Sequence, residues 1–292
     1  SYFQTLNQSL KNHERAIPVL IIDLDLLDQN IDQLKRMLPP ALDFRIVVKS
    51  LPAPQLIQYV MERARTRKLM VFHQPFLSQL SDRADETVDI LLGKPMPVTT
   101  AAYYYRQLKP QNGFEPSRQL QWLVDTEKRL GEYLELSRKI GQPLRVNLEI
   151  DVGLHRGGFD STERLANTLR LIQAHPQQLQ LSGLMGYDPH VVKLPRIIRS
   201  EARALQMAND QYQLFVQLIQ DQFPDLWRED LTLNGAGSPT FGLHTGAQSV
   251  INEVAVGSAL VKPTTFDIPT LNNFQVACFI ATPVLKKLKG TT

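Results

Sequence analysis

The chain has 292 residues, of which 43% are hydrophobic, so it can bury a large core and form one principal domain plus a remainder. Its net charge of +3 is too diffuse to indicate nucleic-acid binding, and no lysine and arginine cluster is interleaved with aromatic residues. Cys278 is the single cysteine, no signal peptide opens the chain and no apolar stretch reaches membrane-spanning length, so we expect a protein of the reducing cytoplasm.

In chain order, the sequence repeats a short apolar strand, a turn and an amphipathic helix. The first strand is predicted over residues 19–24, and a helix with an apolar stripe at Leu27, Ile31, Leu34 and Leu38 follows it. Comparable stripes lie at residues 56–64 and 205–219. Eight further strands are predicted over residues 45–48, 69–72, 89–92, 121–124, 145–150, 181–187, 231–234 and 253–256.

This alternation predicts a parallel sheet with right-handed crossover connections. Eight strand and helix units favour a closed (β/α)8 barrel over an open doubly wound sheet, and the span of about 43–259 is near the customary size. The strand at 19–24 would be a ninth strand, and we expect it to lie outside the barrel.

The last part of the chain predicts the beginning of a β-domain. Residues 274–285 alternate loosely, as one or two strands do, but one short β-segment cannot form an independent domain. Either the chain is a fragment of a longer protein, or the small domain is completed in another way. We therefore predict a barrel domain with its leading strand at residues 17–263 and an incomplete β-domain at residues 264–292.

Lys49 is the first candidate for chemistry. It closes the apolar run at residues 44–48, and Pro52 and Pro54 stop the strand directly after it. An amine at the end of a buried strand is partly desolvated, which lowers its pKa and makes it available as a Schiff-base nucleophile. The alternative is that Lys49 is an ordinary solvated surface charge.

Arg156 is the second candidate, on a glycine-rich turn after the strand at 145–150. The C-terminal ends of barrel strands are where barrel enzymes collect their active-site residues. The guanidinium group offers fixed donors suited to a phenolate or a carboxylate, and the preceding Glu149 could hold its plane. An ordinary structural ion pair is the alternative reading of these two residues.

The next three strand ends carry a tyrosine and small residues. Tyr187 follows the strand at 181–187, and the last two strands lead into turns rich in glycine and hydroxyl groups. Small residues let backbone N–H groups approach an anion, and barrel enzymes often bind phosphate after strands seven and eight. Plain loops are the alternative for these turns. The candidate phosphate ligands are Gly237, Ser238, Thr240, Gly257 and Ser258.

Together these segments resemble the fold-type III pyridoxal-phosphate enzymes, a group that includes alanine racemase, D-threonine aldolase and D-serine dehydratase. The resemblance runs from Ile17 to Lys262. It implies that Lys49 holds pyridoxal 5'-phosphate, that Arg156, in the motif Asp-x-Gly-x-x-Arg, faces the phenolic oxygen of the cofactor, and that the two turns form a phosphate cup. The aldolase and dehydratase branch is the most similar one, with Tyr187 at the tyrosine of its rim.

Two departures from alanine racemase bear on the reaction. Ala255 stands where alanine racemase has an arginine that faces the pyridine nitrogen, and without that cation the cofactor is a stronger electron sink. Glu149 stands where alanine racemase has a lysine. The resemblance therefore implies a lyase, of the aldolase or dehydratase kind, that acts at the α-carbon of a small amino acid of D configuration, with or without a β-hydroxyl group.

The alternatives are an amino-acid racemase, a pyridoxal-phosphate carrier without turnover, and a barrel that binds another phosphate compound with Lys49 in a structural role. The resemblance also implies a homodimer, in which the β-domain of one subunit closes the barrel of the other. The lyase branch adds a divalent metal in that domain, but no metal ligands are predicted within this chain, whose six histidines lack metal-ligand spacing.

Overall fold

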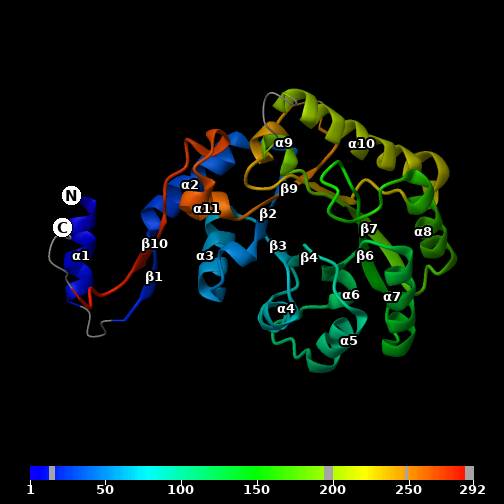
Figure 1. Ribbon diagram of the computed structural model, residues 1–292. Helices are drawn as coiled ribbons and strands as arrows, with labels where there is room; N and C mark the ends of the chain where they lie inside the picture. Colours follow the sequence, from blue (N-terminus) through cyan, green and yellow to red (C-terminus); the bar gives the residue numbers. More distant parts are fainter. Residues whose placement is uncertain (13–16, 194–199, 247–248, 287–292) are drawn as a thin grey trace.

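The computed structural model describes residues 1–12, 17–193, 200–246 and 249–286. Eight parallel strands form a closed barrel in the order β2 to β9, with β9 pairing back to β2, and helices surround it (Figure 1). The predicted (β/α)8 barrel is therefore confirmed. The barrel strands are β2 (Asp43–Val47), β3 (Lys68–Val71), β4 (Asp89–Leu92), β5 (Leu120–Val124), β6 (Leu144–Glu149), β7 (Leu179–Gly186), β8 (Thr232–Gly235) and β9 (Glu253–Val256).

The helices present their apolar stripes to the barrel. The predicted stripes at residues 56–64 and 205–219 fall in α3 and α10, and most of their members are buried. No helix in the described part of the chain is long and apolar enough to cross a membrane. The α-helices are α1 (Tyr2–Lys11), α2 (Leu24–Met37), α3 (Pro54–Ala64), α4 (Gln74–Ser81), α5 (Val98–Gln107), α6 (Pro116–Gln119), α7 (Glu127–Ile140), α8 (Thr162–Ala174), α9 (His190–Lys193), α10 (Glu201–Gln222) and α11 (Ser258–Val261).

Two predicted strand ends are wrong for local reasons. Strand β1 (Val19–Ile22) ends before Asp23, because the Asp23 carboxylate accepts the backbone N–H of Leu26 at 3.0 Å and so caps α2. Strand β2 ends at Val47, because Val48–Ser50 form a short 3-10 turn. The cap and the 3-10 turn both depend on the few residues that follow an apolar run. The apolar run alone therefore predicts a strand that is too long.

A small antiparallel sheet lies outside the barrel. Strand β1 pairs with β10 (Cys278–Ala281), from Val19 opposite Ala281 to Ile22 opposite Cys278 (Figure 1). The position of β1 outside the barrel is confirmed, and residues 274–285 contain one strand. Because β1 and β10 come from opposite ends of the chain, the boundary between 17–263 and 264–292 stays a prediction, and residues 287–292 lie outside the described part.

The barrel interior contains charged residues as well as apolar ones. Arg45 is completely buried, and its guanidinium group contacts Glu253 at 2.6 Å and Asp89 at 2.7 Å. Glu253 also accepts from Lys68 at 3.0 Å. A buried charge is tolerated only when it is paired and hydrogen-bonded, so these strands must keep their register for the network to form.

Candidate functional site

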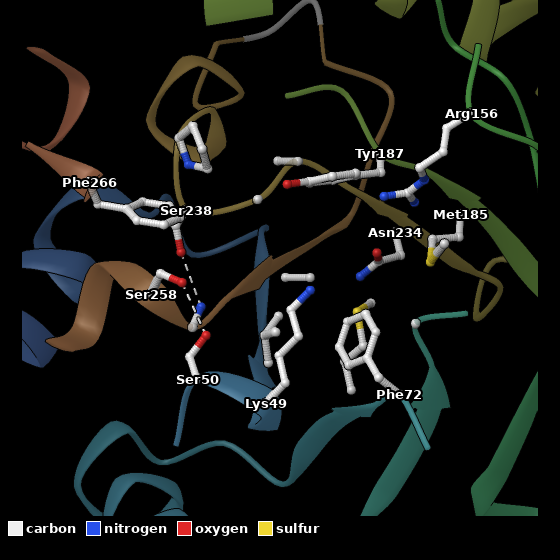
Figure 2. Close-up of a pocket in the computed structure, with 18 residues that line it drawn as sticks. Lys49, Ser50, Phe72, Arg156, Met185, Tyr187, Asn234, Ser238, Ser258 and Phe266 are labelled. Carbon is white, nitrogen blue, oxygen red and sulfur yellow. Dashed lines mark hydrogen bonds between the residues drawn. The ribbon is translucent and has the colours of Figure 1, made fainter. Parts of the chain in front are cut away.

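A cavity opens at the C-terminal ends of the barrel strands, where the sequence predicts the site. Its lining comes from strands on both sides of the barrel and from their following loops (Figure 2). The space between these residues, together with the open solvent at its mouth, measures about 620 Å3. A concave site lined by apolar residues and a few polar groups is typical of small-molecule binding. Its lining residues are Val47, Lys49, Ser50, Met70, Phe72, Gly93, Arg156, Met185, Tyr187, Asn234, Ala236, Gly237, Ser238, Pro239, Ala255, Gly257, Ser258 and Phe266.

Lys49 extends into this cavity from the turn after β2 (Figure 2). The 3-10 turn is closed by a hydrogen bond of 2.9 Å from the N–H of Leu51 to the carbonyl oxygen of Val48, and Pro54 then begins α3. Burial lowers the pKa of Lys49, and the positive charges of Arg156 and Lys94 lower it further. A larger fraction of this amine is therefore neutral near pH 7 than of an ordinary lysine.

Phe72 lies beside the Lys49 amine and was not selected from the sequence. Lys49 Nζ is 4.1 Å from the centre of the Phe72 ring, which follows β3. Gly93 makes room for this ring, because a Cβ atom at Gly93 would lie 2.4 Å from Phe72 Cζ. The glycine at the end of β4 therefore allows the aromatic wall to form, and only the packing between neighbouring strands reveals it.

The turn after β6 brings Arg156 to the cavity. Asp151 Oδ1 accepts the backbone N–H groups of Gly153 and His155, both at 2.9 Å, and this fixes the beginning of the turn. The chain then returns to the strand, where the Phe159 N–H donates to the Glu149 carbonyl oxygen at 2.8 Å. This closed loop carries Arg156 back over the end of β6.

Arg156 contacts both Glu149, with which the sequence pairs it, and Tyr187, a contact that was not expected. Its Nη2 lies 3.4 Å from Glu149 Oε1. Its guanidinium carbon lies 5.0 Å from the centre of the Tyr187 ring, and Figure 2 shows these two side chains side by side. Burial raises the pKa of Glu149, although Arg156 opposes this effect. Burial likewise raises the pKa of Tyr187, so its hydroxyl group stays protonated and able to donate.

Hydroxyl groups and small residues form the opposite wall of the cavity. Ser238 Oγ accepts the backbone N–H groups of Gly257 at 3.2 Å and Ala259 at 3.0 Å, which leaves its own proton free to donate. Ser258 Oγ lies 3.1 Å from Ser50 Oγ (Figure 2). Ser50, which follows Lys49, was not selected from the sequence, although its place beside the lysine was a signal for it.

Two glycines of this wall are required by close packing. A Cβ atom at Gly257 would lie 2.6 Å from the Val47 carbonyl oxygen, and one at Gly237 would lie 2.6 Å from Tyr187 Cε2. The predicted residues Gly237, Ser238, Gly257 and Ser258 therefore surround one space, together with Ser50.

Thr240 is placed differently from the expectation that its hydroxyl group faces an anion. The side chain is completely buried, and its Oγ1 donates to Asp188 Oδ1 at 2.7 Å while accepting the Gly237 N–H at 3.2 Å. Thr240 does not line the cavity, and its hydroxyl group donates its hydrogen bond to Asp188 instead.

Asn234, at the end of β8, lines the cavity and is a further residue that the sequence analysis did not select. Its Nδ2 donates to Glu253 Oε1 at 2.8 Å. A carboxylate only accepts, so Glu253 fixes the orientation of the amide group. The sequence signal for Asn234 was a polar residue near the end of a strand. Its partner Glu253 lies on β9, so this contact could not be predicted locally.

The cavity thus combines a nucleophilic amine, a permanent cation and a wall of small residues and hydroxyl donors. The amine can attack a carbonyl carbon, the cation can hold a phenolate or carboxylate, and the donors can hold an anion such as a phosphate. Lys49, Arg156, Tyr187, Gly237, Ser238, Gly257 and Ser258 all lie around the same space.

Known proteins resemble this chain in family profile and in fold. The family profile described as alanine racemase, N-terminal domain, matches residues 22–264. Similar solved structures are D-threonine aldolase from Filomicrobium marinum (TM-score 0.70, 18% identity, 92% of this chain and 71% of that chain) and D-threo-3-hydroxyaspartate dehydratase from Delftia sp. HT23 (TM-score 0.67, 18% identity, 91% and 67%). Alanine racemase from Bacillus anthracis with bound L-Ala-P is also similar (TM-score 0.69, 13% identity, 92% and 64%).

These likenesses, at under 20% identity, show a shared fold, and the chain spans about two thirds of the length of each of these proteins. The curated proteins contain no match to this sequence.

Proposed function

Because the chain belongs to the family of the alanine racemase N-terminal domain, whose fold-type III enzymes use pyridoxal phosphate, we propose that its cavity binds this cofactor through Lys49. The observation that carries the proposal is the position of the Lys49 amine in one cavity with Arg156 and with the serine wall, which is formed by Ser50, Ser238 and Ser258. Lys49 suits an aldehyde, Arg156 suits a phenolic oxygen, and the serine wall suits a phosphate.

The residues present fit the chemistry of this cofactor. Ser238 has a proton to donate, because its Oγ atom already accepts the N–H groups of Gly257 and Ala259 at the start of α11. Gly257 and Gly237 have no side chains that would fill the space. Arg156 would hold the phenolic oxygen, with Glu149 keeping its plane.

Pyridoxal phosphate, when bound, supplies an electron sink for the negative charge that develops at the α-carbon of an amino acid. The residues of this chain supply the attachment and the proton transfer. Lys49 Nζ is the nucleophile for the aldehyde carbon, because its lowered pKa leaves more of the amine neutral. The same Nζ atom would accept the α-proton of an amino acid, and the Tyr187 hydroxyl group would donate to the cofactor ring; both side chains line the cavity.

The reaction we propose is that of a lyase of the aldolase or dehydratase kind, acting on a small amino acid of D configuration with or without a β-hydroxyl group. Ala255 supports this choice, because it lines the cavity with a methyl group where alanine racemase has a cation. D-Threonine aldolase and D-threo-3-hydroxyaspartate dehydratase share the fold. We also propose that the working form is a homodimer, which sedimentation equilibrium would test.

The experiment compares the protein with Lys49→Ala and with Lys139→Ala, an exposed lysine on α7 that serves as the control. Each protein is mixed with pyridoxal phosphate, reduced with borohydride and mapped by mass spectrometry. We expect the reduced adduct on residue 49 in the protein and in the control, and its absence in Lys49→Ala. An adduct at another lysine, or none in any protein, would overturn the proposed site.

The reaction class is tested separately, with D-threonine, D-serine and D-alanine as substrates and with and without a divalent metal. Release of an aldehyde or a keto acid supports the lyase. Racemisation of alanine without release of an aldehyde or a keto acid would show that the protein is a racemase and not a lyase.

A further inference from the structure

Asp188 is a buried carboxylate directly behind the cavity, and it follows Tyr187 in the loop after β7. Its side chain is 2% exposed, and its Oδ1 atom accepts the Thr240 hydroxyl proton at 2.7 Å. Thr240 belongs to the loop after β8, and it also accepts the N–H of Gly237 at 3.2 Å. One carboxylate oxygen of the Tyr187 loop is thus joined to the turn that carries the serine wall.

The second oxygen of Asp188 is held by a histidine from the same loop as Thr240. His244 Nε2 lies 2.6 Å from Asp188 Oδ2, and His244 Nδ1 lies 2.9 Å from Ser249 Oγ. Because the carboxylate only accepts, the proton of this pair lies on Nε2. His244 is itself 5% exposed, so the pair is shielded from water, and a hydrogen bond to an ionised group is strong there.

Direct packing joins the same two loops on the cavity side. A Cβ atom at Gly237 would lie 2.6 Å from Tyr187 Cε2, so the tyrosine ring rests against the glycine. The preceding Ala236 has a φ of 57°, a left-handed conformation that is strained for alanine. The surrounding contacts must hold this turn in place, and the hydrogen bond between Gly237 and Thr240 is one of them.

We propose that Asp188 is a positioning residue that couples Tyr187 to the Gly237–Ser238 turn, so that the two walls of the cavity form one unit. This role of Asp188 rests on the proposed function. Asp188 would act on the cofactor only through its neighbours. Without Asp188, the strained turn and the tyrosine lose their common anchor. The cofactor would then have to order both walls as it binds, and its affinity would fall.

A double-mutant cycle on pyridoxal-phosphate affinity tests the coupling. The four proteins are the unchanged chain, Asp188→Ala, Tyr187→Ala and the double variant, each titrated by absorbance. We expect Asp188→Ala to weaken binding roughly tenfold in the unchanged chain, the size of one hydrogen bond to a charged group. In the Tyr187→Ala background, we expect the same change to cost less than about threefold, because the tyrosine that it positions is gone.

Equal losses in both backgrounds, or no loss in either, would overturn the proposal, because a purely structural role gives additive effects. If Asp188→Ala does not fold, Thr240→Val replaces it in the cycle, since it removes the same link from the other loop. Tyr104→Phe is the control: it deletes a buried hydrogen bond of 3.0 Å to Ser81, between α4 and α5, and should leave affinity unchanged.

The inference and the proposed function fail differently. If the unchanged protein yields no borohydride-fixed adduct, the proposed function is wrong. If the adduct forms and the cycle is additive, only the role of Asp188 is wrong.

Discussion

Lys49 Nζ lies 4.1 Å from the centre of the Phe72 ring, so the one amine that the sequence singles out is held against an aromatic wall at the strand end. The ring attracts the ammonium form, whereas burial and the charges of Arg156 and Lys94 disfavour it. Burial and these two positive charges lower the pKa of Lys49.

The first prediction follows from this lowered pKa. Only the neutral amine is nucleophilic, so labelling of Lys49 by an amine reagent should rise with pH at lower values than labelling of an ordinary lysine. Lys94→Gln removes one positive charge, and the pKa of Lys49 should then move back up, which shifts the labelling curve to higher pH. Residue-specific mass spectrometry across a pH series measures both curves. A curve for Lys94→Gln that coincides with that of the unchanged protein would contradict this.

The second prediction concerns the Arg156 and Glu149 pair. Arg156→Ala should perturb the absorbance titration of the bound cofactor more than Glu149→Gln does, because Glu149 acts through the arginine at 3.4 Å. Spectra of both variants across a pH series provide the comparison. If neither variant changes the titration, the pair is structural only.

Ser238→Asp is the third test, and it addresses the phosphate side. A carboxylate at this position would face an anion and would no longer donate, so affinity for pyridoxal phosphate should fall by roughly 1–3 kcal/mol. Ser81→Ala is a matched control, since Ser81 is a buried serine that contacts Tyr104 away from the cavity lining. An unchanged dissociation constant for Ser238→Asp would show that the anion binds elsewhere.

The fourth prediction compares two glycines of different surroundings. Gly257→Ala places a Cβ atom 2.6 Å from the Val47 carbonyl oxygen and 2.8 Å from Val47 Cβ, so the backbone must shift. We expect a loss of about 1–3 kcal/mol in the free energy of unfolding. Gly131→Ala, on α7 with open space around the new atom, should instead stabilise by about 0.5–1 kcal/mol. Urea unfolding measures both, and a neutral Gly257→Ala would refute the close packing.

The fifth prediction concerns the buried ion network of the barrel. Arg45→Met removes the guanidinium partner of Glu253 and one of the two guanidinium partners of Asp89, so we expect a loss of about 3–5 kcal/mol in the free energy of unfolding. Arg138→Met removes an exposed pair with Glu135 and should cost less than about 1 kcal/mol. Comparable losses in the two variants would contradict a network that depends on burial.

The same variant should alter acid unfolding. Burial alone would raise the pKa of Asp89, but Arg45 and Arg145 lower it below its ordinary value. A carboxylate with a lowered pKa contributes stability above its unfolded pKa and loses it as the pH falls through the folded value. Arg45→Met removes one cause of the lowering, so its acid unfolding should occur at higher pH, as circular dichroism during acid titration would measure.

Much of the barrel could be predicted because each strand and helix is encoded locally. Every residue of the buried strand β5 except Gln121 is apolar, and α3 begins at Pro54 after a proline-rich stop. Counting such units is enough to indicate a closed barrel. Lys49, Arg156 and Ser238 could be selected for the same reason, since each follows its own strand and strand ends gather at one face.

The contacts between strands could not be read in this way. Gly93 makes room for Phe72, Glu253 orients Asn234, and Asp188 accepts a hydrogen bond from Thr240. Each of these pairs joins residues from different strand and helix units. The sequence by itself determined the repeating units and the residue types at their ends, because periodicity and turn chemistry act over a few neighbouring residues. Only the tertiary structure decided which side chains face the cavity and which stand behind it, because closing the barrel sets distances between residues far apart in the chain.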